Sequence, residues 1–77
     1  MTKYLQRINI DSKIMVGKPV IRGTRIPVDL ILAKLAQNIN VKEILGDYPS
    51  LTEDDVKAAI YYAKAILDHE EVYPFAN

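Results

Sequence analysis

The spacing of apolar residues changes about one third of the way along the chain. In the first part, Ile8 and Ile10 alternate with polar neighbours, which is the period of a half-buried strand. The segment Lys18–Pro27 carries β-branched residues on both sides of Gly23, and glycine readily adopts the positive φ that a tight turn requires. These patterns predict a small β element over residues 4–27, with a hairpin turn at Gly23.

From Val28 onward, apolar residues recur at helical spacing in three runs. Asn40, with Glu43 three places later, predicts the start of the second helix as a capping box. Thr52 predicts the start of the third helix, which has three acidic residues in its first turn. The expected core stripe of that helix comprises Val56, Ala59, Ile60, Ala63, Ile66 and Leu67. The expected helices span residues 28–37, 41–48 and 52–69, and a tail follows at 70–77.

The second and third expected helices are joined by a four-residue link, which is the spacing of a helix-turn-helix unit. The predicted fold class is therefore α+β and mainly α, with a small N-terminal β-hairpin followed by a three-helix, helix-turn-helix-like bundle. We expect a single domain over residues 1–77, because the chain is too short for a second one.

A chain of 77 residues buries only a small core, and such domains usually need an additional source of stability. The sequence contains no cysteine and one histidine, so we expect no disulfide, no zinc cluster and no cofactor. Tyr61 and Tyr62 extend the apolar surface of the third helix beyond one stripe. We therefore expect a homodimer, with these two tyrosines as candidate partner-binding residues.

The net charge is zero, but the charges are unevenly distributed. Residues 1–27 carry six basic side chains and one acidic side chain, a net charge of +5, and residues 28–77 carry −5. Two interpretations stay open: a basic patch that meets a phosphate backbone, or a polarised chain whose halves pair with each other or with a dimer mate.

Four residues of the basic segment are candidates for contact with DNA. They are Lys18, Arg22, Thr24 and Arg25. Arginines beside a turn can reach phosphates or base edges. The alternative is that Arg22 and Arg25 pair with the acids at the start of the third helix. Those acids argue against that helix as the reading element, because a recognition helix meets the major groove with its N-terminal residues.

The sequence lacks the signals of several other protein classes. Glycine, lysine and threonine between residues 17 and 25 do not follow the order of a phosphate-binding loop. No pattern brings a nucleophile and a base together, so we expect no enzymatic activity. The N-terminal residues contain no apolar run of signal-peptide length, and no stretch is long enough to cross a bilayer. We therefore expect a cytoplasmic protein without a membrane partner.

The C-terminal segment carries three apolar residues beyond the last expected helix. They are Val72, Tyr73 and Phe75. They are candidate partner-binding residues in a recognition tail. The alternative, that they fold back on their own domain or on a dimer mate, stays equally open.

The run from Gly17 to Val28 closely resembles the small prokaryotic family called domain of unknown function 433. The segments Glu43–Leu45, Tyr48–Pro49 and Leu51–Val56 extend the resemblance, which covers roughly residues 8–65. Asn38 stands where the family usually has glycine, and asparagine tolerates the same left-handed conformation.

Members of this family look like antitoxins of the VapB type in a homeodomain-like helix-turn-helix superfamily. The resemblance implies a toxin with a PIN-like ribonuclease fold as partner and binding to the protein's own promoter. The family has no agreed catalytic residues, so none is carried over. The expected function is thus an antitoxin-like binding protein, and the alternative is a structural dimerisation or adaptor module without nucleic-acid contact.

Overall fold

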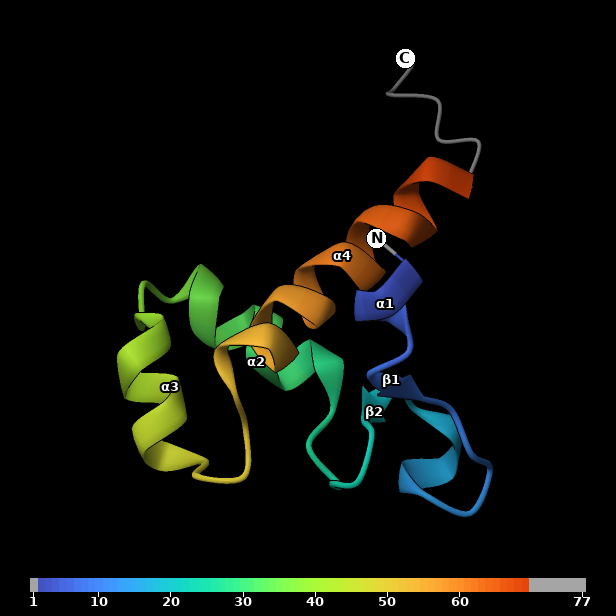
Figure 1. Cartoon of the computed structure of the whole chain (residues 1–77), viewed down its shortest axis with the longest axis horizontal. Helices are drawn as coiled ribbons and strands as arrows, with labels where there is room; N and C mark the ends of the chain where they lie inside the picture. Colours follow the sequence, from blue (N-terminus) through green and yellow to red (C-terminus); the bar gives the residue numbers. More distant parts are fainter. Residues whose placement is uncertain (1, 70–77) are drawn as a thin grey trace.

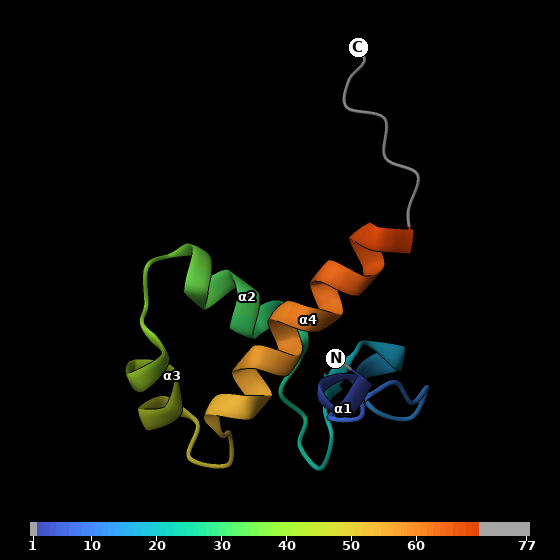
Figure 2. The same cartoon turned by 45° about the horizontal axis from the view of Figure 1, so that its top comes forward.

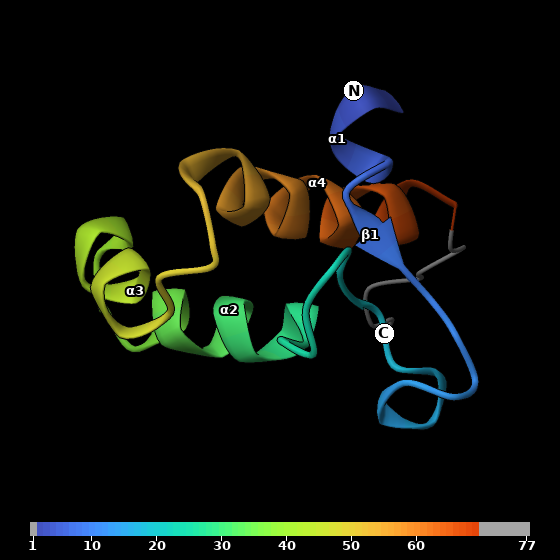
Figure 3. The same cartoon turned by 60° about the horizontal axis from the view of Figure 1, so that its bottom comes forward.

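The computed structural model describes residues 2–69 of the chain. Its elements in chain order are α1 (Thr2–Leu5), β1 (Ile8–Asn9), the 3-10 turn η1 (Met15–Gly17), β2 (Val20–Ile21), α2 (Val28–Ala36), α3 (Val41–Asp47) and α4 (Glu53–His69). In Figures 1, 2 and 3, α1 and α3 lie on opposite sides of the long helix α4. The fold is α+β and mainly helical, as the sequence predicts.

The two strands form a small antiparallel sheet in which Ile8 pairs with Ile21 and Asn9 with Val20. The expected hairpin at Gly23 is thus only part of the arrangement, because the main partner of β2 is β1. The other edge of β2 meets the end of the turn, where the Ile21 amide donates a 3.0 Å hydrogen bond to the Ile26 carbonyl. Both β2 residues are fully buried, because β1 pairs with one edge of the strand and the end of the turn at Ile26 covers the other edge.

Two N-terminal features differ from the expected strands and turns. Residues Thr2–Leu5 form the short helix α1, which packs against α4. Met15, Val16 and Gly17 all have positive φ, at 50°, 55° and 79°. Hydrogen bonds from the amides of Gly17 and Lys18 to the carbonyls of Ile14 and Met15 close this left-handed turn. The sequence does not predict this turn, because β-branched residues such as Val16 disfavour the left-handed region.

The three later helices begin and end at recognisable signals. Pro27 precedes α2, and Asn38 beyond its end has a φ of 65°, the expected left-handed conformation. The Asn40 side chain caps α3 by accepting a 2.8 Å hydrogen bond from the Glu43 amide. Thr52 caps α4, since its hydroxyl accepts a 3.2 Å bond from the Asp55 amide. The expected ranges 28–37, 41–48 and 52–69 thus correspond to α2, α3 and α4.

The core lies where α2, α3 and the sheet meet α4. Its buried residues are Ile8, Val20, Ile21, Val28, Ile31, Ile44, Leu51, Val56, Ala58 and Ala59. The expected stripe of α4 is wrong at Ile60, Ile66 and Leu67, which are exposed. The stripe is confirmed at Val56 and Ala59, which are buried. Asp55, Ala58 and the half-buried Tyr62 are the other inward positions, so the buried face is rotated around the helix from the expected one. Small alanines allow other elements to approach α4 closely there.

Candidate functional site

The Arg22–Arg25 turn connects β2 to α2 and is organised by the side chain of Thr24. Its hydroxyl donates to the Ile21 carbonyl at 2.7 Å and accepts from the Ile26 amide at 3.0 Å. Gly23 has a φ of 82°, the positive value predicted for it. Thr24 is therefore a structural residue of the turn, because its hydroxyl is already engaged in two hydrogen bonds within it.

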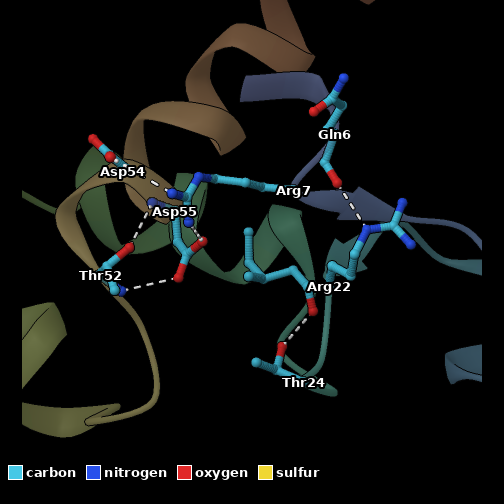
Figure 4. A network of polar contacts seen from close by, with 8 residues as sticks. Gln6, Arg7, Arg22, Thr24, Thr52, Asp54 and Asp55 are labelled. Carbon is cyan, nitrogen blue, oxygen red and sulfur yellow. Dashed lines mark hydrogen bonds and ion pairs between the residues drawn. The ribbon is translucent and has the colours of Figure 1, made fainter. Parts of the chain in front are cut away.

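The Arg22 guanidinium is held by neutral groups. Its Nε donates to the Gln6 carbonyl at 2.7 Å (Figure 4). Its Nη2 donates to the Ile8 carbonyl at 3.1 Å. Main-chain carbonyls fix the orientation of the side chain without cancelling its charge. The pairing of Arg22 or Arg25 with the acids of α4 does not occur, because no ion pair within residues 2–69 involves either arginine. Both side chains are exposed on the turn.

Arg7 takes the place expected for Arg22 and Arg25 beside α4. Its Nη1 lies 3.0 Å from Asp55 Oδ1, and its Nη2 lies 3.6 Å from Asp54 Oδ2. The other Asp55 oxygen accepts a 2.9 Å hydrogen bond from the Thr52 amide. Both carboxylate oxygens of the buried Asp55 thus have a hydrogen-bond partner (Figure 4).

Arg7 is an organising residue that no sequence pattern indicates, and Asp55, expected only as a favourable charge near a helix start, is its buried partner. A capping box running from Thr52 to Asp55 was readable from the sequence, since both side chains suit that role. Nothing local identified Arg7, which is 48 positions from Asp55.

Lys18 is an exposed residue just before β2, and it is paired with Asp29 at the start of α2. Its Nζ lies 2.9 Å from Asp29 Oδ2, and both side chains are more than half exposed. Such a pair contributes about 0–1 kcal/mol and weakens in salt. Lys18 can therefore exchange Asp29 for another anion at little cost.

A shallow polar cleft of about 380 Å³ lies beside this network. It is lined by Lys3, Gln6, Arg7, Arg22 and Asp55. In Figure 4 the side chains of Arg7 and Arg22 extend in opposite directions, so the two guanidinium groups do not converge on one point. The geometry favours contacts spread along a surface over a single enclosed anion site.

The structure separates the candidate partner-binding residues. Tyr61 stacks on Tyr4 of α1, with ring centroids 4.9 Å apart and an interplanar angle of 18°. Tyr62 packs against the core and lines a small apolar pocket of about 290 Å³ between α2 and α4. Part of the apolar excess on α4 is thus covered by α1. Val72, Tyr73 and Phe75 lie outside the described residues.

Comparison with known proteins identifies the family of this chain. The family model described as "Protein of unknown function (DUF433)" matches residues 8–63. The chain belongs to this family. The resemblance seen in the sequence is thereby confirmed.

Two relatives with similar sequences are both uncharacterised. A protein of Archaeoglobus fulgidus is 72% identical over 25 residues, which are 32% of this chain and 69% of that protein. The protein y4eO of Sinorhizobium fredii is 40% identical over 52 residues, which are 68% of this chain but only 24% of the longer relative.

A solved structure shares the fold. The crystal structure of a DUF433 member from Anabaena variabilis superposes with a TM-score of 0.75 at 35% identity, over 87% of this chain and 70% of that one. None of these relatives carries a known activity in its name. Among residues 2–69, no helix has the length and apolar character needed to span a bilayer.

Proposed function

We propose that this chain is an antitoxin-like binding protein that neutralises a PIN-like ribonuclease toxin and regulates its own promoter. In this role the chain acts in the cytoplasm as a homodimer and binds macromolecules without catalysing a reaction. Promoter DNA is contacted by the Arg22–Arg25 turn, and the start of α4 does not enter the groove. The proposal builds on the family resemblance and on the electrostatics of the turn.

The observation that carries the DNA contact is the way Arg22 is held. Two main-chain carbonyls orient its guanidinium, so its full charge remains available to an anion beside the exposed Arg25. A preoriented arginine loses less conformational entropy when it binds phosphate. Lys18, whose pair with Asp29 is weak, extends the same basic surface towards α2.

The start of α4 is a poor surface for DNA. Its first turn carries Glu53, Asp54 and Asp55, and Arg7 is paired with the two aspartates. Two carboxylates against one guanidinium, with the exposed Glu53 beside them, leave this end of the helix negative. A phosphate backbone approaching it would be repelled.

The test measures binding of DNA from upstream of the protein's own gene at several salt concentrations, by fluorescence anisotropy. Arg25→Ala is the cleanest variant, because within residues 2–69 the exposed Arg25 side chain takes part in no ion pair or hydrogen bond. Losing one phosphate contact should reduce the salt slope by about one unit and weaken binding. Lys42→Ala, an exposed lysine of α3, is the matched control of equal charge change and should leave the slope nearly unchanged.

Two results would contradict this arrangement. A larger loss with Lys57→Ala or Lys64→Ala than with Arg25→Ala would return the contact to α4. No binding of wild-type protein to the upstream DNA at low salt would remove the regulatory half of the proposal.

The second candidate is a dimerisation or adaptor module without nucleic-acid contact. The observation that favours it is the internal pairing of Arg7 with Asp54 and Asp55 and of Lys18 with Asp29. A dimer in sedimentation, combined with no DNA affinity at low salt, would favour this candidate.

A further inference from the structure

An open groove lies between the helices α1 and α4. In Figure 1, α1 lies on the side of α4 away from α3. The groove has a volume of about 410 Å³ and is lined by Tyr4, Lys57, Ile60, Tyr61 and Lys64. The stacked rings of Tyr4 and Tyr61 form one part of it. We refer to these five residues, together with the adjacent Lys3, as the α1–α4 groove.

The α1–α4 groove exposes apolar surface in the middle of a long helix. Ile60 remains 48% exposed, although Ala58 and Ala59, which precede it in α4, are fully buried. The two tyrosine rings are only half-buried. Apolar surface of this kind, surrounded by charged residues, is typical of an interaction site.

The charges around the groove are of one sign. Lys57 and Lys64 line it, and Lys3 Nζ lies 5.6 Å from the centroid of the Tyr4 ring. Among residues 2–69, the ion pair formed by these lysines is that of Lys64 Nζ with Asp68, at 2.7 Å and one helical turn away. Both side chains of this pair are more than half exposed, and such pairs contribute little to stability, so a partner can replace Asp68.

We propose that the α1–α4 groove docks an acidic, apolar segment of a protein partner, such as one face of an amphipathic helix. Apolar side chains of the segment pack on Ile60 and the tyrosine rings, and its carboxylates meet the three lysines. This inference rests on the proposed function only for the identity of that partner.

Two other occupants fit the groove less well. A second copy using the same groove about a two-fold axis would bring the lysines of both copies together, which is unfavourable. A single-stranded nucleic acid needs free aromatic faces for its bases, but Tyr4 and Tyr61 already stack on each other and Ile60 has no aromatic face.

The position of the groove also allows both partners of the proposed function to bind together. In Figure 1 the turn that follows β2 lies at the bottom of the molecule, and the α1 and α4 ribbons lie above it. A protein in the groove therefore leaves the Arg22–Arg25 turn accessible to DNA.

The experiment titrates the full chain with a synthetic amphipathic peptide that carries leucine on one helical face and glutamate on the other. Ring-proton NMR signals of Tyr4 and Tyr61 report occupancy of the groove directly. We expect saturable shifts of these signals, and weaker binding of the same peptide with glutamine in place of glutamate. Lys57→Gln combined with Lys64→Gln should weaken binding of the acidic peptide by about fivefold.

The matched control is Lys34→Gln combined with Lys42→Gln, which removes the same charge from α2 and α3 and should leave binding unchanged. Ile60→Ser, at an exposed position that does not threaten the fold, should weaken binding of both peptides. Circular dichroism of every variant should match the wild type.

Four results would overturn the proposal. They are the absence of saturable shifts, equal binding by the groove and control variants, a stronger response to a thymidine oligonucleotide than to the peptide, and a wild-type dimer that Ile60→Glu dissociates. The last would assign the groove to a second copy. DNA binding is measured separately through Arg25→Ala, so the proposed promoter contact can fail while the groove still binds the peptide, and the reverse.

Discussion

The N-terminal part of the domain, residues 2–27, and the helical part, residues 28–69, are stabilised in different ways. The helical part consists of elements of seven to 17 residues, and the starts of α3 and α4 are capped by the neighbouring side chains of Asn40 and Thr52. The N-terminal part contains no element longer than four residues, and its position depends on distant groups. Arg7 reaches Asp55 on α4, and Arg22 reaches back to Gln6 and Ile8.

This difference separates local from long-range determinants of one small fold. A cap such as Asn40 acts within three residues, so α3 starts where its own sequence directs. The short strands have too few hydrogen bonds to persist alone, and they are ordered because α4 supplies a partner for them. The basic groups proposed to contact DNA lie in the part that depends on the rest of the molecule, whereas Lys57 and Lys64 of the groove lie on α4.

The largest expected effect comes from breaking the link between the two parts. Asp55→Ala removes a buried carboxylate that accepts from both Arg7 and the Thr52 amide, and should cost about 2–3 kcal/mol of unfolding free energy. Asp55→Asn retains an acceptor for Thr52 and should cost less. Asp54→Ala, at a half-exposed position with a 3.6 Å contact, is the control and should cost under about 1 kcal/mol. Equal losses at the two positions in urea denaturation would show that burial of Asp55 contributes nothing.

A smaller effect is expected at the turn. Gly23→Val should cost about 1–2 kcal/mol, because a β-branched residue is strained at a φ of 82°. Gly46→Ala in α3 should instead stabilise by about 0.5–1 kcal/mol, because alanine favours a helix. A Cβ at either glycine would meet nothing within 4 Å, so the backbone conformation alone sets the opposite signs. Thermal melting that shows the same sign for both variants would contradict this reasoning.

The smallest effect is expected at the left-handed turn. Val16 is 96% exposed and has a φ of 55°, so Val16→Gly relieves strain and loses no packing. After the entropy cost of glycine, the net gain should be about 0.5 kcal/mol. Ile10→Gly, another exposed apolar residue but without positive φ, should destabilise. A lower melting temperature for Val16→Gly would show that the side chain has a contact in solution.

Much of the helical part could be predicted because its signals are local. Asn38 and Gly23 adopt the positive φ values that their residue types favour, and Asn40 caps α3. The inward face of α4 could be read only in part from apolar periodicity, which predicts Val56 and Ala59 but not the buried Asp55 and Ala58. Asp55 is buried only because Arg7 neutralises it, and that pairing exists only once the chain has folded.

The sequence predicts an exposed turn that carries Arg22 and Arg25, but it does not predict the contacts of the basic side chains around it. The basic segment does carry an exposed arginine turn, but two of its cations, Arg7 and Lys18, are engaged with acids of the same chain. The role of Thr24 within the turn follows from its hydrogen bonds, which no sequence pattern distinguishes from a hydroxyl that faces DNA.

The double role of Asp55 has a consequence for how the molecule melts. The same carboxylate completes the cap of α4 and holds β1, and the Tyr4–Tyr61 stack joins α1 to α4 as well. Fraying of the N-terminal segment therefore weakens the start of the longest helix, and loss of that helix releases the segment. The Arg7–Asp55 ion pair and the Tyr4–Tyr61 stack thus couple the unfolding of the N-terminal part to that of the helical part. Far-ultraviolet ellipticity reports the helices, and the ring-proton NMR signals of Tyr4 and Tyr61 report the stacked rings. The two measurements should accordingly trace one coincident unfolding transition.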